Sequence, residues 1–342
     1  MNKQSIYDLT IDELKSYLLS CGEPKYRAQQ IFSLLHKGVV VKDLTNIPKP
    51  LREKLEQDFY AELPKIVGEQ VATDGTKKFL LELHDGLTIE CVLLQAEYGQ
   101  TVCVSTQVGC KMRCAFCLSG RNGFVRNLSA GEILAQIFVA AGVIEKKSNK
   151  ESTLRVVLMG SGEPLDNFDN VWKFVRLVND KEGINISTRN ISLSTVGLAS
   201  KIREFADLQS GVNLCISLHA PNDEIRRKIM PVAKKYPIGE LMDSAKYFFQ
   251  KTGRRVIFEY CLIENMNCSV DNARELAKLV KGFPTHVNLI LLNSTGGNMN
   301  PPSRATAMKF MDALIKEGVS CTFRKSKGDD IMAACGQLKG QN

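Results

Sequence analysis

The sequence contains no apolar run long enough to cross a bilayer, which takes about 20 consecutive apolar residues. Its first residues, MNKQSIYDLTIDELK, lack the apolar core of a signal peptide. It also has no internal repeat and no low-complexity segment. We therefore expect a globular protein that stays in the cytoplasm and has no membrane partner.

A second Cys-x2-Cys pair, which zinc sites usually require, is also missing. The chain nevertheless has 11 cysteines. In a reducing cytoplasm such residues serve metal binding or catalysis rather than a disulfide framework. Cysteine chemistry is therefore the first place to look for a function.

Length and charge set broad limits. A chain of 342 residues can form one large barrel and a small accessory domain. A composition of 44% hydrophobic and 24% charged residues is typical of a globular protein. The net charge of +8 suits a polyanionic partner. Charge alone is weak evidence, because many basic enzymes never bind nucleic acid.

Three cysteines, Cys110, Cys114 and Cys117, lie in the short run GCKMRCAFC. Thiolates this close together can converge on one soft metal centre. A four-iron cluster usually takes four Cys ligands, so three leave one iron open, as in reactive metal sites. Alternatives are a zinc site completed by a distant His or Cys, and three unrelated buried cysteines. The spacing favours an open [4Fe-4S] cluster.

This Cys-x3-Cys-x2-Cys spacing resembles the signature of the radical S-adenosylmethionine superfamily. The resemblance implies that S-adenosylmethionine binds the open iron and is split to give a 5′-deoxyadenosyl radical. Cofactor radicals are used when the target carbon is too inert for polar chemistry.

Residues 1–64 are predicted to form a helical accessory domain. Thr10 and Glu13 make a capping box for a first helix, a second covers Tyr26–His36, and a third follows Pro50. On charge alone, RNA contact and a solvated helical surface are equally good interpretations. The basic residues concerned are Lys25, Arg27, Lys37, Lys42, Lys49, Arg52 and Lys54.

Residues 65–98 are predicted to form a short antiparallel β extension. Asp74-Gly75 and Asp85-Gly86 are hairpin turn signals between apolar runs. In the last run, LTIECVLL, alternation places Glu90 on the face opposite Ile89 and Cys91.

From residue 99 to 342 the pattern alternates between strand and helix. Such alternation implies parallel strands joined by crossover helices. Six units favour a partial (β/α)6 TIM-like barrel of the α/β class, although a doubly wound sheet fits the alternation too. The expected strands lie in residues 101–107, 154–160, 190–195, 212–219, 255–263 and 286–293, with a closing strand at 319–325.

Polar residues follow the ends of these strands, where barrels build their active sites. The cysteine run follows the first strand, and the segment GSGEP follows the second. Ser194, Ser217 and Asn293 lie at later strand ends and offer hydroxyl or amide partners for ribose or adenine. Glu163 could accept from the cofactor's amino group. His219 lies among them, although a lone His is more often structural.

Two further cysteines stand apart from those that we interpret as small buried hydrophobes. Cys335 lies in AACGQLKG, a Gly-bearing segment near the chain end that suits a mobile thiol. A thiolate can take a methyl group from a sulfonium and carry it. Cys103 lies just before the cysteine run, and a second thiol could release the product by disulfide exchange. The cysteines interpreted as buried are Cys21, Cys215, Cys261, Cys268 and Cys321.

The segments CVSTQVGC, GEPL, ISLSTVGL, SLHAPNDEIR and RKSKGDDIMAACGQL resemble the RNA adenine-carbon-2 methyltransferases, the dual-specificity family acting on 23S ribosomal RNA and transfer RNA. The likeness covers nearly the whole chain. It implies that Cys335 carries the methyl group, that Cys103 forms a transient disulfide with it, and that Glu90 accepts a proton.

The same resemblance implies the cofactors and partners. These are a [4Fe-4S] cluster, S-adenosylmethionine consumed twice per turnover, an electron donor such as flavodoxin or ferredoxin, and a monomeric enzyme. The cluster ligands would be Cys110, Cys114 and Cys117, and the S-adenosylmethionine contacts would be Gly162, Glu163, Ser194, Ser217, Leu218, His219 and Asn293.

The chain departs from the family pattern in places. Ser161 replaces the usual Met, Met332 stands where Asp is common, and the 294–303 loop is atypical. None of these changes removes a group that the chemistry needs. Two alternatives stay open: a sister activity at adenine carbon 8 that confers antibiotic resistance, and a non-catalytic iron–sulfur RNA-binding protein.

Overall fold

The computed structural model describes residues 3–96, 99–142 and 154–339. Its first helices are α1 (Ile11–Ser20), α2 (Tyr26–Leu35) and α3 (Lys49–Asp58). The capping box of Thr10 and Glu13 is confirmed. α3 begins before Pro50. Pro is tolerated in the first helical turn, because a backbone N–H at that position would have no partner within the helix.

The main sheet has ten strands in the order β1-β2-β3-β4-β7-β8-β9-β10-β11-β12. Its first four strands pair antiparallel, and the two predicted Asp-Gly turns join β1 to β2 and β2 to β3. The antiparallel extension therefore continues the barrel sheet. These strands are β1 (Lys65–Val71), β2 (Lys77–Glu82), β3 (Thr88–Ala96) and β4 (Gly99–Cys103).

From β4 onward all neighbours in this sheet pair parallel. The remaining strands are β7 (Leu154–Leu158), β8 (Ile191–Thr195), β9 (Asn213–Ser217), β10 (Val256–Leu262), β11 (Thr285–Leu291) and the short β12 (Cys321–Phe323). Burial on both faces accounts for their nearly continuous apolar runs.

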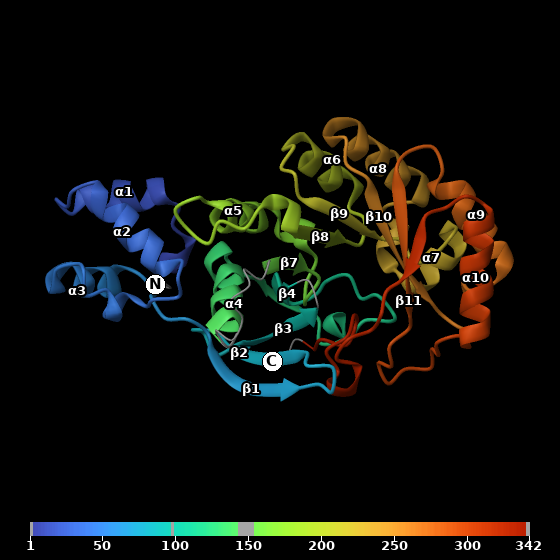
Figure 1. The fold of residues 1–342 in the computed structure, drawn as a ribbon, viewed down its shortest axis with the longest axis horizontal. Coiled ribbons are helices and arrows are strands. Elements are labelled where there is room, and N and C mark those ends of the chain that lie inside the picture. The colour runs from blue at the N-terminus through green and yellow to red at the C-terminus, as the bar shows by residue number, and fades with distance from the viewer. Residues whose placement is uncertain (1–2, 97–98, 143–153, 340–342) are drawn as a thin grey trace.

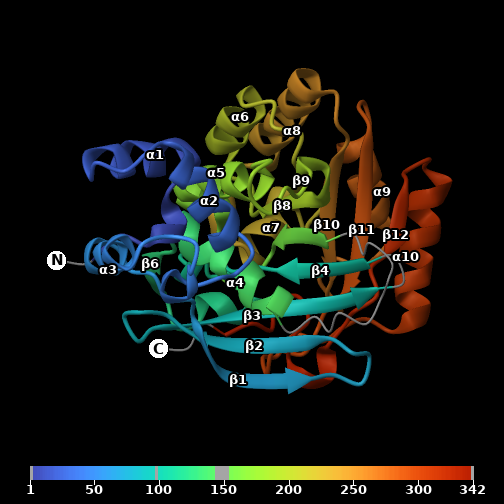
Figure 2. The same cartoon turned by 60° about the vertical axis from the view of Figure 1, so that its left-hand side comes forward.

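Seven helices among the described residues connect or follow these strands, and Figures 1 and 2 show α6, α8, α9 and α10 along the outer side of the sheet. The predicted partial barrel is confirmed. None of the helices in the described ranges is long and apolar enough to cross a membrane. The seven are α4 (Ala130–Gly142), α5 (Phe168–Asn179), α6 (Ala199–Asp207), α7 (Asp223–Ile229), α8 (Ile238–Thr252), α9 (Val270–Val280) and α10 (Arg304–Lys316).

The predicted end of the first barrel strand, expected over residues 101–107, is wrong. β4 stops at Cys103, and a separate hairpin pairs β5 (Gln107–Gly109) with β6 (Phe124–Asn127). Gly109 allows this pairing, because its φ is +74° and a Cβ there would lie 2.0 Å from the Gly123 carbonyl oxygen. The cysteine run is the loop of this hairpin.

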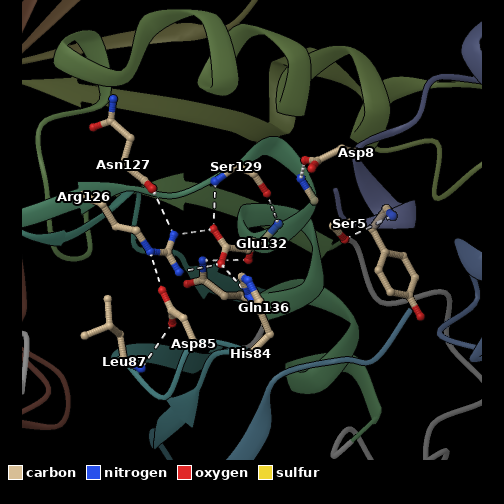
Figure 3. Close-up of polar contacts among 12 residues, drawn as sticks. Ser5, Asp8, His84, Asp85, Leu87, Arg126, Asn127, Ser129, Glu132 and Gln136 are labelled. Atoms are coloured by element: carbon tan, nitrogen blue, oxygen red, sulfur yellow. Dashed lines mark hydrogen bonds and ion pairs between the residues drawn. The ribbon is translucent and has the colours of Figure 1, made fainter. Parts of the chain in front are cut away.

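Polar contacts anchor the base of the hairpin (Figure 3). Arg126 of β6 donates two hydrogen bonds of 2.8 Å to the Glu132 carboxylate of α4 and one of 2.7 Å to Asp85 in the β2–β3 turn. Asp8 of the N-terminal segment accepts from the Gly131 N–H at 2.6 Å. The hairpin, α4, the β2–β3 turn and the N-terminal segment are thereby joined.

Candidate functional site

A cavity lies where the parallel strands end, and it gathers ten of the thirteen predicted site residues. Strands carry these side chains to one rim because parallel strands all end at the same side of a barrel. The ten are Cys110, Cys114, Cys117, Gly162, Glu163, Ser194, Ser217, His219, Asn293 and Cys335.

The three cysteines of the β5–β6 loop fit an iron–sulfur cluster by donor type. Burial raises the pKa of Cys110 to about 12, and Glu163 and Cys117 raise it further. Burial also raises the pKa of Cys114 well above its usual value, and the other two cysteines add to this. Burial also raises the pKa of Cys117, against hydrogen bonds from Ser119. Such thiols ionise readily only beside a strong cation, and a soft metal centre provides one.

The three cysteines also share one loop and line one cavity, which supports their fit to an iron–sulfur cluster. Among residues 3–96, 99–142 and 154–339, no three His, Cys, Asp or Glu side chains are already gathered in a group that could hold a metal ion.

The GSGEP loop packs tightly on the segment leading to the cysteines. A Cβ on Gly160 would lie 2.7 Å from the Ser105 nitrogen, and one on Gly162 would lie 2.7 Å from Thr106 Oγ1. Ser161 is fully buried, and its N–H donates to Ser105 Oγ at 2.9 Å. Its side-chain hydroxyl donates to Ser119 Oγ at 3.3 Å, so a hydrogen bond to the cysteine loop accommodates the departure at Ser161.

Glu163 is buried at the end of this loop with its carboxylate held by backbone. Oε2 accepts from the Val196 N–H at 2.8 Å and Oε1 from the Leu165 N–H at 3.0 Å. Burial raises the pKa of Glu163 to about 7, although these hydrogen bonds oppose the shift. A bound ammonium group would favour the carboxylate form.

His219 combines a packing role with a place in the cavity. Its Nδ1 accepts from the Cys261 N–H at 2.9 Å, and its ring meets Phe116 edge-on at 4.7 Å. Burial, helped by the charge of Arg226, lowers the pKa of His219 to about 3. The imidazole is therefore neutral, with its proton on Nε2.

Cys335 lines this cavity and also a second one, whose wall includes Cys103. The C-terminal segment is held in place by the Asn293 amide, which donates to the Cys335 carbonyl at 3.0 Å, and by the Leu118 N–H, which donates to the Gly336 carbonyl at 2.7 Å. Cys335 thus lines one cavity with the three loop cysteines and the other with Cys103.

The guanidinium of Arg324 lines both cavities. Its pKa is raised, first by the negative charge available at Cys335. Burial raises the pKa of Cys103 to about 12, Cys335 adds to this, and Arg324 opposes it. Cys103, Cys335 and Arg324 are therefore close enough to influence one another electrostatically.

Glu90 and Leu218 lie outside the main cavity. Glu90 faces away from Ile89 and Cys91 as predicted, but the C-terminal segment covers it: its carboxylate pairs with Lys78 Nζ at 3.1 Å and accepts from the Lys339 N–H. Burial raises the pKa of Glu90, opposed by Lys78. Leu218 is a core residue whose N–H donates to the Glu259 carbonyl at 3.1 Å and whose carbonyl accepts from Arg226 at 3.2 Å.

Glu259 is a cavity residue that the sequence analysis missed. It is 4% exposed, and it pairs in register with Ser217 on β9. Its Oε1 accepts from Asn288 Nδ2 at 3.0 Å, whereas Oε2 has no hydrogen-bond partner among the described residues. A charged residue inside the apolar run RVIFEYCLI was the available signal, because charged residues are seldom buried without a reason.

The chain is similar to known proteins over nearly its whole length. A family model for the radical SAM superfamily matches residues 104–280, and one for the ribosomal RNA large subunit methyltransferase N-terminal domain matches residues 4–61. The "probable dual-specificity RNA methyltransferase RlmN" of Clostridium novyi is 46% identical over 340 residues, 98% of each chain.

A protein of the same name in Bacillus subtilis is 45% identical over 343 residues, which cover 99% of this chain and 94% of the relative. A crystal structure of a radical SAM methyltransferase from Sphaerobacter thermophilus matches 99% of this chain and all of the other with a TM-score of 0.95 and 41% identity. The chain therefore belongs to the radical SAM superfamily and, within it, to the RlmN family of dual-specificity RNA methyltransferases.

Proposed function

We propose that the protein methylates carbon 2 of an adenosine in 23S ribosomal RNA, and of an adenosine in transfer RNA, through a methyl group carried on Cys335. The observation that carries this proposal is the position of Cys335 between two cavities, one with the three loop cysteines and one with Cys103. The names of the relatives support the RNA substrates and the dual specificity.

Membership of the superfamily brings a [4Fe-4S] cluster and S-adenosylmethionine. When bound, they supply a methyl group and radical chemistry that acts on an inert carbon. Cys110, Cys114 and Cys117 would hold the cluster. S-adenosylmethionine would contact Gly162, Glu163, Ser194, Ser217, His219 and Asn293, and the backbone of Leu218.

The chain's own residues then act in order. The Cys335 sulfur takes up the methyl group in the cavity that it shares with Arg324. Once the carbon is joined to the adenine, Glu90 accepts the proton that the ring carbon loses, after the C-terminal segment has moved off it. Attack of Cys103 sulfur on Cys335 sulfur forms a disulfide and breaks the bond to the transferred carbon, which takes up a proton.

The partners and division of the chain complete the proposal. Residues 1–64 would bind RNA, residues 65–98 would extend the barrel sheet, and residues 99–342 would form the catalytic core with Cys335 in its tail. Flavodoxin or ferredoxin would donate electrons to a monomeric, cytoplasmic enzyme. The basic surface of the first segment and the net charge of +8 support the RNA partner.

Anaerobically reconstituted protein incubated with a 23S ribosomal RNA fragment or a transfer RNA, and with methyl-labelled S-adenosylmethionine, tests the proposal. Digested RNA should contain labelled 2-methyladenosine, and the Cys335→Ala variant should produce none. Labelled 8-methyladenosine would show instead that the protein methylates carbon 8, the sister activity. RNA that stays unlabelled while the protein cleaves S-adenosylmethionine would contradict methyl transfer to RNA.

A further inference from the structure

Arg226 of α7 is a completely buried cation. Every hydrogen bond that its guanidinium makes within the described part of the chain ends on a backbone carbonyl. Nε donates to Leu218 at 3.2 Å, Nη1 to Tyr236 at 3.2 Å, and Nη2 to Val196 at 2.6 Å and Ser217 at 3.5 Å. Burying a charged side chain carries a large desolvation free energy, so an arginine at this position calls for a reason beyond packing.

Two of the four acceptor residues, Val196 and Ser217, line the cofactor cavity. Ser217 ends β9, Leu218 follows it, and Val196 follows β8, so one planar group holds the carboxyl ends of two adjacent strands. Gly197 makes room for it: a Cβ there would lie 3.3 Å from Arg226 Nη2 and 2.6 Å from Leu241.

Val196 also reaches Glu163. Its carbonyl accepts from Arg226, while its N–H, which belongs to the preceding peptide group, donates to Glu163 Oε2 at 2.8 Å. The guanidinium therefore fixes the residue whose N–H holds the Glu163 carboxylate.

The same helix also contacts the cysteine loop. Ile229, the last residue of α7, accepts from the Ala115 N–H at 2.8 Å, between Cys114 and Cys117. Burial lowers the pKa of Arg226 to about 10, and Cys114 opposes this shift, so Arg226 remains a cation at neutral pH.

We infer that Arg226 is a positioning residue for S-adenosylmethionine: its guanidinium fixes the ends of β8 and β9 and, by holding the Val196 backbone, aims the Glu163 carboxylate. This inference rests on the proposed role of Glu163 and Ser217 in binding the cofactor. A guanidinium has five donors in one plane, so a lysine keeps the charge but cannot bridge the same carbonyls.

The test compares Arg226→Lys and Arg226→Met with Arg227→Met, which changes the exposed neighbour on the same helix. Reconstituted proteins are titrated with S-adenosylmethionine by equilibrium dialysis without RNA, and binding is also followed by the cofactor-induced change in the electron paramagnetic resonance spectrum of the reduced cluster. Thermal unfolding of each variant reports the fold.

Both Arg226 variants should bind the cofactor about 10- to 100-fold more weakly, the range seen when supporting groups behind a ligand are lost. The spectral change should return at higher cofactor concentration, and Arg227→Met should match wild type. In methylation assays the KM for the cofactor should rise more than kcat falls. A folded Arg226→Lys protein with wild-type affinity would overturn the inference.

A double-mutant cycle separates positioning from a loss of fold. If Arg226 acts through Glu163, the effect of Arg226→Lys on affinity should largely vanish in a Glu163→Gln background. If the two substitutions instead weaken cofactor affinity independently, so that their fold-changes multiply, Arg226 does not act through Glu163. Because RNA is absent, a wrong RNA target leaves these results unchanged, whereas a wild-type protein that binds no S-adenosylmethionine would refute the proposed function itself.

Discussion

At the scale of single residues, the surroundings of Cys335 suit a thiol that is first modified and then attacked. It is exposed, it lines two cavities, and Arg324 lies beside it. Protein isolated from cells should therefore carry a methyl group on Cys335, detectable by peptide mass spectrometry. The peptide containing Cys268, a buried cysteine outside both cavities, is the internal control. Normal methylation of RNA by a Cys335→Ala variant would assign the carrier role elsewhere.

Cys103 gives a second prediction at this scale. Replacing it with Ala should leave methylation of Cys335 intact but stall release, because no thiol remains to attack the Cys335 sulfur. A protein–RNA adduct should accumulate, seen as a shifted band on a denaturing gel that ribonuclease removes. Cys215→Ala, which removes another buried thiol, should give no adduct. Free turnover of the Cys103→Ala variant would show that Cys103 is only a core residue.

At the scale of elements, a buried histidine joins the N-terminal helices to the barrel. His36, at the end of α2, stacks on Phe32 at 3.9 Å and meets Phe138 of α4 edge-on at 5.8 Å. Burial lowers the pKa of His36 to about 4. The folded state therefore favours the neutral ring, and its contribution to stability is complete above the unfolded pKa of about 6.5 and lost as pH falls toward 4.

The free energy of unfolding should consequently drop by up to about 3 kcal/mol over this window, since each pKa unit corresponds to about 1.4 kcal/mol. Urea unfolding at a series of pH values measures it. His36→Phe keeps an aromatic ring without a titrating proton, so its stability curve should be flatter between pH 6.5 and 4. An unchanged pH dependence in that variant would contradict the assignment.

Much of this element pattern could be predicted from the sequence. The capping box of α1 and the strands β7 to β11 follow from local composition and periodicity. The β5–β6 hairpin does not, since the break after Cys103 depends on the close approach of Gly109 to Gly123. The cavity rim was predictable because polar residues follow strand ends.

Long-range contacts limited what the sequence could predict about the site. The covering of Glu90 by Lys339 joins residues 249 positions apart in the chain. Arg226 lies in the charged stretch DEIRRK, where nothing local distinguishes a buried arginine from the exposed Arg227 beside it. Only the packing of α7 against the ends of β8 and β9 makes that distinction.

At the scale of the whole molecule, the N-terminal helices project to one side of the barrel (Figure 1) and carry the exposed lysines Lys25, Lys37 and Lys42. Replacing all three with Glu should weaken transfer RNA binding and make its dependence on salt less steep, since each lost phosphate contact lowers the logarithmic slope by about 0.7–0.9. Filter binding at several salt concentrations measures both quantities.

The matched control replaces Lys246, Lys278 and Lys309, exposed on α8, α9 and α10, with Glu. It changes the net charge equally and should affect RNA binding less. Equal losses in both triple variants would indicate a general charge effect, and the N-terminal lysines would then be a solvated surface.

Methylation of carbon 2 of RNA adenines through Cys335 is the reaction that we propose for this chain. The most direct measurement is mass spectrometry of nucleosides from 23S ribosomal RNA and transfer RNA in cells that lack the protein, carry it, or carry the Cys335→Ala variant. We predict 2-methyladenosine in both RNAs only where the wild-type protein is present. An unchanged level of 2-methyladenosine in cells that lack the protein would contradict the account.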